Sequence, residues 1–311
     1  MSSAEDKITD WFAGQNKLNG RRFPIGIGDD MAMVELVGNK SFLVTTDMLL
    51  EGVHFDLSKT TLEQVGYKAM AVSLSDCAAM ATKPIGAVAA VALPRGYGAA
   101  ELKKIYNGIN KAALKYNCPL IGGDITSWKS DAGFAINITM FSSVGNCKPV
   151  RRSGAQVDDV ICVTGFLGGS DLGKHLEFEP RVLEALEITS IVKVNSMMDL
   201  SDGLSSDLPR ICKQSNVGAL IEENRLPVSP QAMSKPDPLA AVLNDGEDFE
   251  LLFTLSRKDS EKLFENWEGN LIITPIGQIT GTGIVEMQTA CGLIVTLKQK
   301  GYDHLGGDNG V

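Results

Sequence analysis

Acidic residues gather where apolar runs of this chain end, beside glycine, serine or threonine, and this pattern limits what the chain can fold into. The segments that show it are residues 28–30, 41–47, 71–76, 119–124 and 199–203. Acids on a solvated face need no partner, whereas acids at the ends of strands are expected to converge in a cleft. Converging carboxylates repel one another unless hard cations neutralise them. The pattern therefore predicts a site for several Mg²⁺ ions, and a polyphosphate is its natural ligand.

Charge and composition exclude several classes of function. The net charge of −9 argues against general nucleic-acid binding, which needs a basic surface, but metal ions can still bring a nucleotide to acidic side chains. No apolar run approaches the ~18 residues of a membrane span, and no basic segment precedes an apolar one at the N-terminus. We therefore expect a cytoplasmic protein without membrane contact. The 6 cysteines include no C-x-x-C pair, which favours free, mostly buried thiols in a reducing compartment.

The periodicity of apolar residues predicts helices and strands that are mixed without strict βαβ alternation, so α+β is the expected class. Helices are expected at residues 5–12, 62–81, 99–116 and 205–215, and strands at residues 33–36, 42–44, 86–93, 120–121, 134–144, 160–163, 249–254, 271–276 and 292–297. Residues 148–154 interrupt this pattern. We place a boundary there, between an N-terminal domain (1–148) and a C-terminal α/β domain (149–305), and we expect the glycine-rich tail (306–311) to be disordered.

Each acidic motif also has a simpler explanation when it is taken alone. Residues 26–30 and 122–124 are typical of turns, and Thr-Thr-Asp at 45–47 is typical of a strand end followed by a helix cap. Together they supply six or more oxygen ligands, which suits several Mg²⁺ ions that each take one or two carboxylates plus phosphate oxygens. The glycine-rich turn at 165–169 fits neither G-x-G-x-x-G nor Walker A, so we expect a packing turn there. The chain also lacks protein-kinase signatures.

Three further segments are open to two interpretations. His54 is either structural or a substrate contact. The adjacent pair Arg151 and Arg152 is either a solvated linker or a phosphate clamp. Residues 244–250 carry four acids in seven residues and form either a solvated loop or part of the site, since an apolar strand follows them directly.

The ordered set of motifs resembles the thiamine-monophosphate kinase family, whose superfamily includes aminoimidazole ribonucleotide synthetase, selenophosphate synthetase and the hydrogenase-maturation dehydratase. The motifs that carry the resemblance are at residues 26–30, 45–55, 67–80, 121–124, 152–155, 199–204, 246–251 and 301–304, and it extends from Gly26 to about Leu305. The histidine of the second motif and the closing Gly-Tyr-Asp-His favour the thiamine enzyme. A selenophosphate synthetase would carry a reactive Cys or selenocysteine near its N-terminus, and no cysteine precedes Cys77. Asn244-Asp245 and Phe249 depart from the usual family residues, which puts local loop contacts in question.

The resemblance implies an N-terminal mixed sheet flanked by helices that pairs two copies into a homodimer, and a C-terminal α/β sandwich. It implies phosphorylation of thiamine monophosphate by ATP with several Mg²⁺ ions. The implied metal ligands are Asp30, Thr45, Thr46, Asp47, Asp76, Asp124, Asp199 and Asp202; the implied ATP contacts are Tyr106, Gly123, Asp124, Arg152 and Ser201; the implied thiamine-monophosphate contacts are His54, Glu247 and Tyr302.

The chemistry implied by the resemblance is in-line phosphoryl transfer. The acceptor is an ionised phosphate, so no general base is required and none is assigned. We expect Glu247 to attract the cationic thiazolium ring and Tyr302 to stack on a substrate ring.

Two alternatives belong to other classes. The first is a non-catalytic protein that binds a metal–nucleotide complex on the same scaffold. The second is a structural calcium site, which is disfavoured because no D-x-D-x-D-G loop closed by a glutamate at position 12 occurs.

Overall fold

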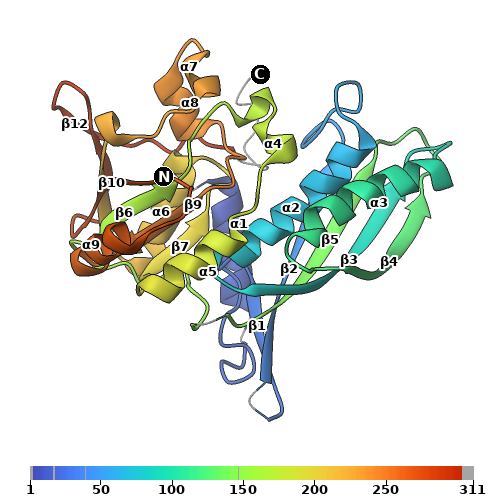
Figure 1. Ribbon diagram of the computed structural model, residues 1–311, viewed down its shortest axis with the longest axis horizontal. Coiled ribbons are helices and arrows are strands. Elements are labelled where there is room, and N and C mark those ends of the chain that lie inside the picture. Colours follow the sequence, from blue (N-terminus) through green and yellow to red (C-terminus); the bar gives the residue numbers. More distant parts are fainter. Residues whose placement is uncertain (1–2, 17, 39, 146, 303–311) are drawn as a thin grey trace.

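The computed structural model describes residues 3–302 apart from residues 17, 39 and 146, so the tail at 306–311 lies outside the described residues. The chain forms two sheets with helices packed on them, one sheet from each half of the sequence (Figure 1). This confirms the predicted α+β class with two α/β domains. Within the described residues, no helix is long and apolar enough to cross a membrane.

The N-terminal sheet has five strands in the order β1-β2-β5-β3-β4, and its strands are β1 (Ala32–Leu36), β2 (Lys40–Leu50), β3 (Lys83–Leu93), β4 (Leu120–Ser127) and β5 (Ala135–Ser143). Only the β3–β4 pair in this sheet is parallel. The sheet is therefore mixed, as expected. β4 is one of its two edge strands, and it pairs with β3 alone.

The C-terminal sheet has seven strands in the order β12-β11-β8-β10-β6-β9-β7. Its strands are β6 (Val160–Thr164), β7 (Ser196–Asp199), β8 (Gly218–Glu222), β9 (Leu251–Leu255), β10 (Ile273–Thr280), β11 (Val285–Gln288) and β12 (Ile294–Thr296). The helices are α1 (Ala4–Gln15), α2 (Leu62–Ala79), α3 (Ala99–Leu114), α4 (Lys174–Glu177), α5 (Val182–Ile191), α6 (Leu204–Ser215), α7 (Pro230–Met233), α8 (Pro238–Asn244) and α9 (Arg257–Asn266).

Helices α2 and α3 lie side by side across one face of the N-terminal sheet (Figure 1). Two glycines allow their close approach. A Cβ atom on Gly66 would lie 2.1 Å from the carbonyl oxygen of Ile105, and one on Gly108 would lie 1.9 Å from that of Glu63. Only a residue without a side chain fits at either position, which fixes the distance between the two helices.

Helix α2 also packs against the C-terminal domain. The rings of Phe178 and Phe249 stack with centroids 4.1 Å apart and lie against Ala71 of α2. The Tyr67 hydroxyl of α2 donates a hydrogen bond to the Phe178 carbonyl, at 2.9 Å. One apolar cluster runs through both halves, from Leu74 of α2 to Phe253 of β9. Because the two domains share α2 and this core, residues from both can form one site.

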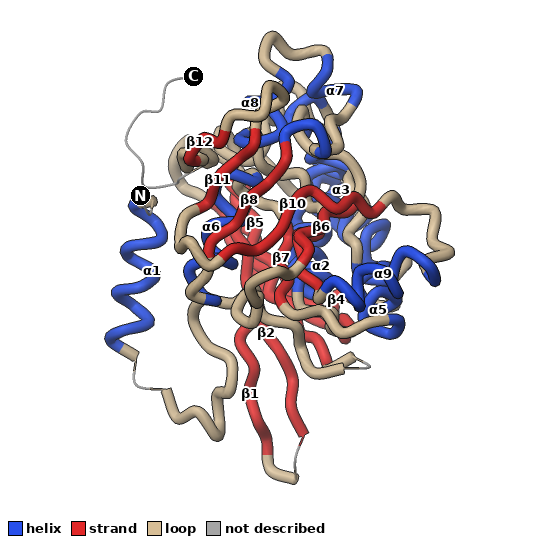
Figure 2. The backbone as a smooth tube through the Cα atoms, turned by 90° about the vertical axis from the view of Figure 1, so that its left-hand side faces the viewer, coloured by secondary structure: helices blue, strands red, loops and turns tan. Residues whose placement is uncertain are grey.

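Helix α1 lies apart from the sheets, and the β1–β2 ribbon extends beyond the rest of the chain (Figure 2). No residue of α1 is buried. Its acidic side chains Asp6 and Asp10 pair with Arg210 and Lys213 of α6. Charge pairing, rather than apolar packing, therefore holds α1 against the C-terminal domain.

Three acidic motifs do not lie at the ends of strands, as the sequence pattern predicted, but inside a strand or a helix. β2 continues through Thr45, Thr46 and Asp47 to Leu50, because β5 pairs with it along this whole stretch and Leu49 is buried. Asp76 lies inside α2, as the predicted helix at 62–81 requires. The strand predicted at 120–121 extends to Ser127, so residues 122–124 are strand and not a turn. Only Asp199 ends a strand as the pattern predicted.

Candidate active site

A cleft of about 540 Å³ lies between the two halves of the chain. Segments that are distant in the sequence line it. They are α1, residues 28–30, β2, the loop carrying His54, α2, Arg152, the end of β7 with the residues after it, Arg210, residues 245–249 and Tyr302. Both domains therefore contribute residues to one polar cleft.

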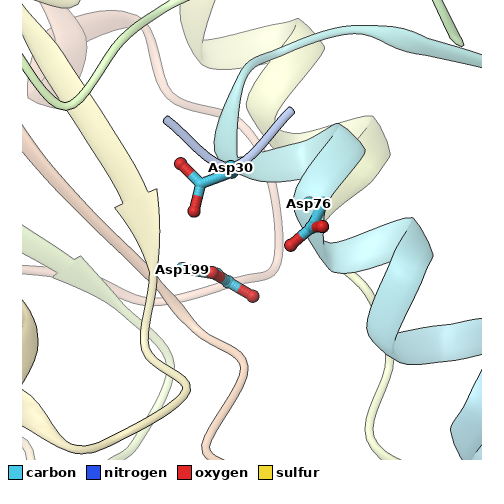
Figure 3. A group of neighbouring side chains, drawn as sticks. All are labelled: Asp30, Asp76 and Asp199. Atoms are coloured by element: carbon cyan, nitrogen blue, oxygen red, sulfur yellow. The ribbon is translucent and has the colours of Figure 1, made fainter. Parts of the chain in front are cut away.

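Asp30, Asp76 and Asp199 form a carboxylate cluster in this cleft, and their side chains converge on one small space (Figure 3). One carboxylate oxygen from each lies within 4.8 Å of the others. Burial, together with the charges of neighbouring aspartates, raises the pKa of Asp76 well above its usual value. Burial and the charge of Asp30 raise the pKa of Asp199 to about 7. Both shifts arise from burial and from crowded negative charge, and a bound cation would offset both.

Hydroxyl groups hold these carboxylates in place. Ser75 donates to Asp199 at 2.5 Å, and Thr45 donates to Asp76. Asp47 stands beside the cluster and accepts a hydrogen bond from Ser73 at 2.6 Å. Burial and the charge of Asp30 raise the pKa of Asp47 to about 6. β2 and α2 thus supply Asp47 and Asp76, together with the hydroxyl groups that orient Asp47, Asp76 and Asp199.

The arginine pair at the start of the C-terminal domain is not a solvated linker. Arg152 donates to both carboxylate oxygens of Asp30, at 2.6 and 3.2 Å, and Arg151 pairs with Asp29 at 2.9 Å. Arg152 itself lines the cleft. The pair therefore ties the acidic segment at 28–30 to the C-terminal domain, beside the carboxylate cluster.

Asp202 lines the same cleft but is engaged by Arg210. The Arg210 guanidinium lies 2.5 Å from Asp202, 2.8 Å from Asp207 and 3.1 Å from Asp6. Sequence reasoning missed Arg210. The one local signal for it was its spacing three residues after Asp207 on a predicted helix.

The three residues expected to contact thiamine monophosphate, His54, Glu247 and Tyr302, line one cleft with the carboxylate cluster. His54 Nδ1 accepts a hydrogen bond from the Leu50 backbone N–H at 3.0 Å, which leaves the ring proton on Nε2 when the imidazole is neutral. Glu247 pairs with Lys68 of α2, whose side chain is completely buried. Sequence reasoning missed Lys68, although a lysine amid the apolar residues of a predicted helix was a signal.

The glycine-rich turn at 165–169 is a packing turn, as predicted. The N–H of Gly168 donates to the Asp248 carboxylate at 2.9 and 3.0 Å, and the N–H of Gly169 donates to Asp245 at 2.8 Å. Glu250 is buried against Arg181, at 2.7 Å. The acidic loop at 245–250 is therefore bound into the domain, and the solvated-loop interpretation is wrong.

Tyr106, Gly123 and Asp124 do not line the cleft of their own chain. Tyr106 is half-exposed on α3, and Gly123 and Asp124 are exposed on β4. Two strands separate β4 from β2, a distance of roughly 14 Å at the usual strand spacing. Asp124 pairs with Ala90 of β3, Ala90 pairs with Asn137 of β5, and Asn137 pairs with Met48 of β2. The Asp124 side chain therefore lies on the same sheet face as Met48, and the side chain of Asp47 lies on the other face.

Comparison with known proteins gives matches over both domains. The model of the AIR synthase related protein, N-terminal domain, matches residues 28–144, and that of the C-terminal domain matches residues 155–290. The thiamine-monophosphate kinase of Rhodopirellula baltica is 37% identical over 84% of this chain and 85% of its own. That of Escherichia coli is 34% identical over 90% of this chain and 91% of its own.

Solved structures agree with these matches. AaThiL complexed with AMPPCP and TMP superposes with a TM-score of 0.80 at 27% identity, and the match covers 97% of each chain. The thiamine-monophosphate kinase from Stenotrophomonas maltophilia superposes with a TM-score of 0.73 at 29% identity, over 92% of this chain and 97% of its own.

Proposed function

Because this chain belongs to the thiamine-monophosphate kinase family, we propose that it transfers the γ-phosphoryl group of ATP to thiamine monophosphate, which gives thiamine diphosphate and ADP. The observation that carries the proposal is the similarity to thiamine-monophosphate kinases across both domains. Similarity over both domains matters because residues of both line the cleft. The complex of AaThiL with AMPPCP and TMP supports the pairing of a nucleotide with this acceptor.

We infer that Asp30, Asp76 and Asp199 hold Mg²⁺, with Asp47 beside them. Hard oxygen donors that lie within 4.8 Å of one another fit this ion, and the raised pKa values of Asp76 and Asp199 mark uncompensated charge. Thr45, Thr46, Asp124 and Asp202 are the further proposed ligands. When bound, Mg²⁺ would neutralise the charge of the phosphate groups and so lower the barrier to in-line transfer.

The residues of the chain mainly position the reactants. Arg152 and Ser201 line the cleft and are the proposed ATP contacts of this protomer. His54, Glu247 and Tyr302 are the proposed contacts of thiamine monophosphate. The acceptor oxygen is ionised near neutral pH, so no side chain has to remove a proton and none is assigned that role.

We infer that the protein acts as a homodimer in which the partner completes the nucleotide site. β4 is exposed from Ile121 to Ser127, and Ile121 and Ile125 are each more than 60% exposed, which suits pairing with a second copy. The remaining proposed ATP contacts are Gly123 and Asp124 of β4 and Tyr106 of α3, the helix that contacts β4, and none of them lines the cleft of its own chain. Pairing through β4 would give these residues a route to the cleft of the second copy.

The test is an assay of the purified protein with ATP, Mg²⁺ and thiamine monophosphate, in which thiamine diphosphate is detected by chromatography. We expect product that depends on all three additions. Turnover of formylglycinamidine ribonucleotide without turnover of thiamine monophosphate would move the protein to the purine-pathway relatives. Binding of ATP with Mg²⁺ in calorimetry, but no turnover with either acceptor, would identify a non-catalytic binding protein.

A further inference from the structure

Lys68 lies in the middle of α2 with 0% of its side chain exposed, although lysine is rarely buried without a partner. Its Nζ atom is 2.7 Å from Glu247 Oε1 and donates to the carbonyl oxygen of His54, also at 2.7 Å. Glu247 belongs to the C-terminal domain, His54 belongs to the loop after β2, and both line the cleft. One buried cation therefore joins two segments that carry proposed acceptor contacts.

The backbone around Glu247 is already fixed without Lys68. Glu247 has a left-handed backbone with φ of +51°, and its N–H donates to the Ser201 carbonyl at 2.7 Å. The N–H of Phe249 donates to the Leu200 carbonyl at 2.9 Å, and the Phe249 ring stacks on Phe178. What these contacts leave undetermined is the direction of the Glu247 carboxylate, and Lys68 supplies that constraint.

The ion pair also changes what Glu247 can do for a ligand. Within the described part of the chain, Lys68 is the only ion-pair partner of Glu247, whose side chain stays 31% exposed. With Oε1 held by Lys68, the second carboxylate oxygen is the one left to accept a hydrogen bond from a ligand. Because the ammonium balances its charge, the carboxylate acts as a directional acceptor more than as a counter-ion for the thiazolium ring.

We propose that Lys68 is a positioning residue of the acceptor subsite. It orients Glu247 to accept a hydrogen bond from the amino group on the pyrimidine ring of thiamine monophosphate. That group is the one N–H donor on the organic part of the acceptor, so the pair selects for an aminopyrimidine. This inference rests on the proposed function.

The test compares Lys68→Met with Lys59→Met, whose lysine is 82% exposed and pairs with Asp56 outside the cleft. Methionine keeps the length and apolar stem of Lys68 but removes the ammonium. We expect Lys68→Met to raise the KM for thiamine monophosphate about ten- to a hundredfold, the usual range for a hydrogen bond to a charged group. The KM for ATP and kcat should change less than about twofold, because the nucleotide contacts are elsewhere. Lys59→Met should behave as wild type.

Two further measurements separate positioning from a general loss of structure. Glu247→Gln should raise the same KM, and the double variant should be no worse than either single variant, because both residues act through one acceptor oxygen. Wild type should discriminate against oxythiamine monophosphate, in which an oxo group replaces the amino group, and Lys68→Met should lose most of that discrimination. Calorimetric binding of thiamine monophosphate should weaken in parallel.

An unchanged KM for thiamine monophosphate in Lys68→Met would overturn the inference, and so would equal rises in both KM values. If circular dichroism shows that Lys68→Met does not fold, Lys68→Gln carries the same test, because it keeps a donor for the His54 carbonyl oxygen but removes the charge beside Glu247. Absence of product from wild type would instead refute the proposed function, before any variant is compared.

Discussion

Replacing Asp199 by Asn is expected to stabilise the metal-free protein at pH 8 while abolishing its activity. Asp199 is 4% exposed, and burial with the charge of Asp30 raises the pKa of its carboxylate from 3.8 to about 7. At pH 8 this group is ionised in both the folded and the unfolded states. The folded state is therefore destabilised by the whole free-energy difference that the pKa shift represents. Three pKa units correspond to roughly 4 kcal/mol, which is an upper bound because the asparagine amide is also polar and buried.

We therefore expect a gain of about 1–3 kcal/mol, or about 2 °C in Tm for each kcal/mol in a chain of this length. The gain should shrink as the pH falls from 8 towards 4.5. Below its folded-state pKa, Asp199 is protonated in the folded wild type, so the cost falls with the pH and vanishes near the ordinary pKa of 3.8. Thermal unfolding in EDTA, followed by circular dichroism, measures both effects. Added Mg²⁺ should then raise the Tm of wild type more than that of the variant.

Asp30→Asn is the matched control. It also removes a carboxylate of the cluster, but it deprives Arg152 of its ion pair and of one of two hydrogen bonds, so it should lower the Tm at both pH values. A Tm of Asp199→Asn at or below that of wild type at pH 8 would refute the reasoning that burial and the charge of Asp30 make ionised Asp199 destabilising. A rise in Tm for Asp30→Asn as large as that for Asp199→Asn would show that Arg152 does not balance the charge of Asp30.

Other outcomes follow from the same geometry. Asp47→Asn and Asp124→Asn should each lose most activity without unfolding, and kinase assays on the folded variants measure this. If Asp124 serves the partner's cleft, an equal mixture of the Asp47→Asn and Asp124→Asn variants that exchanges subunits should regain about a quarter of wild-type activity. Half of the random dimers are then mixed, and each mixed dimer keeps one intact site. No recovery would assign both residues to the site of one protomer. Gly108→Ala should cost roughly 1–3 kcal/mol in urea unfolding, because its Cβ would lie 1.9 Å from the Glu63 carbonyl oxygen, whereas Gly14→Ala, with nothing within 4 Å of its Cβ, should not destabilise.

Local patterns were enough to predict most elements of the fold. The apolar period predicted α2, α3 and α6 to within a few residues at each end, and β3, β5 and β6 likewise. The predictions were wrong where pairing with a distant strand decides the outcome. β2 and β4 extend beyond their apolar cores because β5 and β3 supply hydrogen-bond partners along their length. No local signal carries that information.

For the candidate site, the sequence by itself determined that many acids belong together and, through the ordered motifs, which family they belong to. The tertiary structure decided how they are grouped. It brings Asp30, Asp76 and Asp199 within 4.8 Å of one another, pairs Asp202 with Arg210 and leaves Asp124 on an exposed edge strand. Lys68 entered the site only through its contact with Glu247, a residue far away in the chain. The physical reason is that charge pairing and desolvation depend on distance and burial, which the packing of the two domains on α2 sets and local sequence does not.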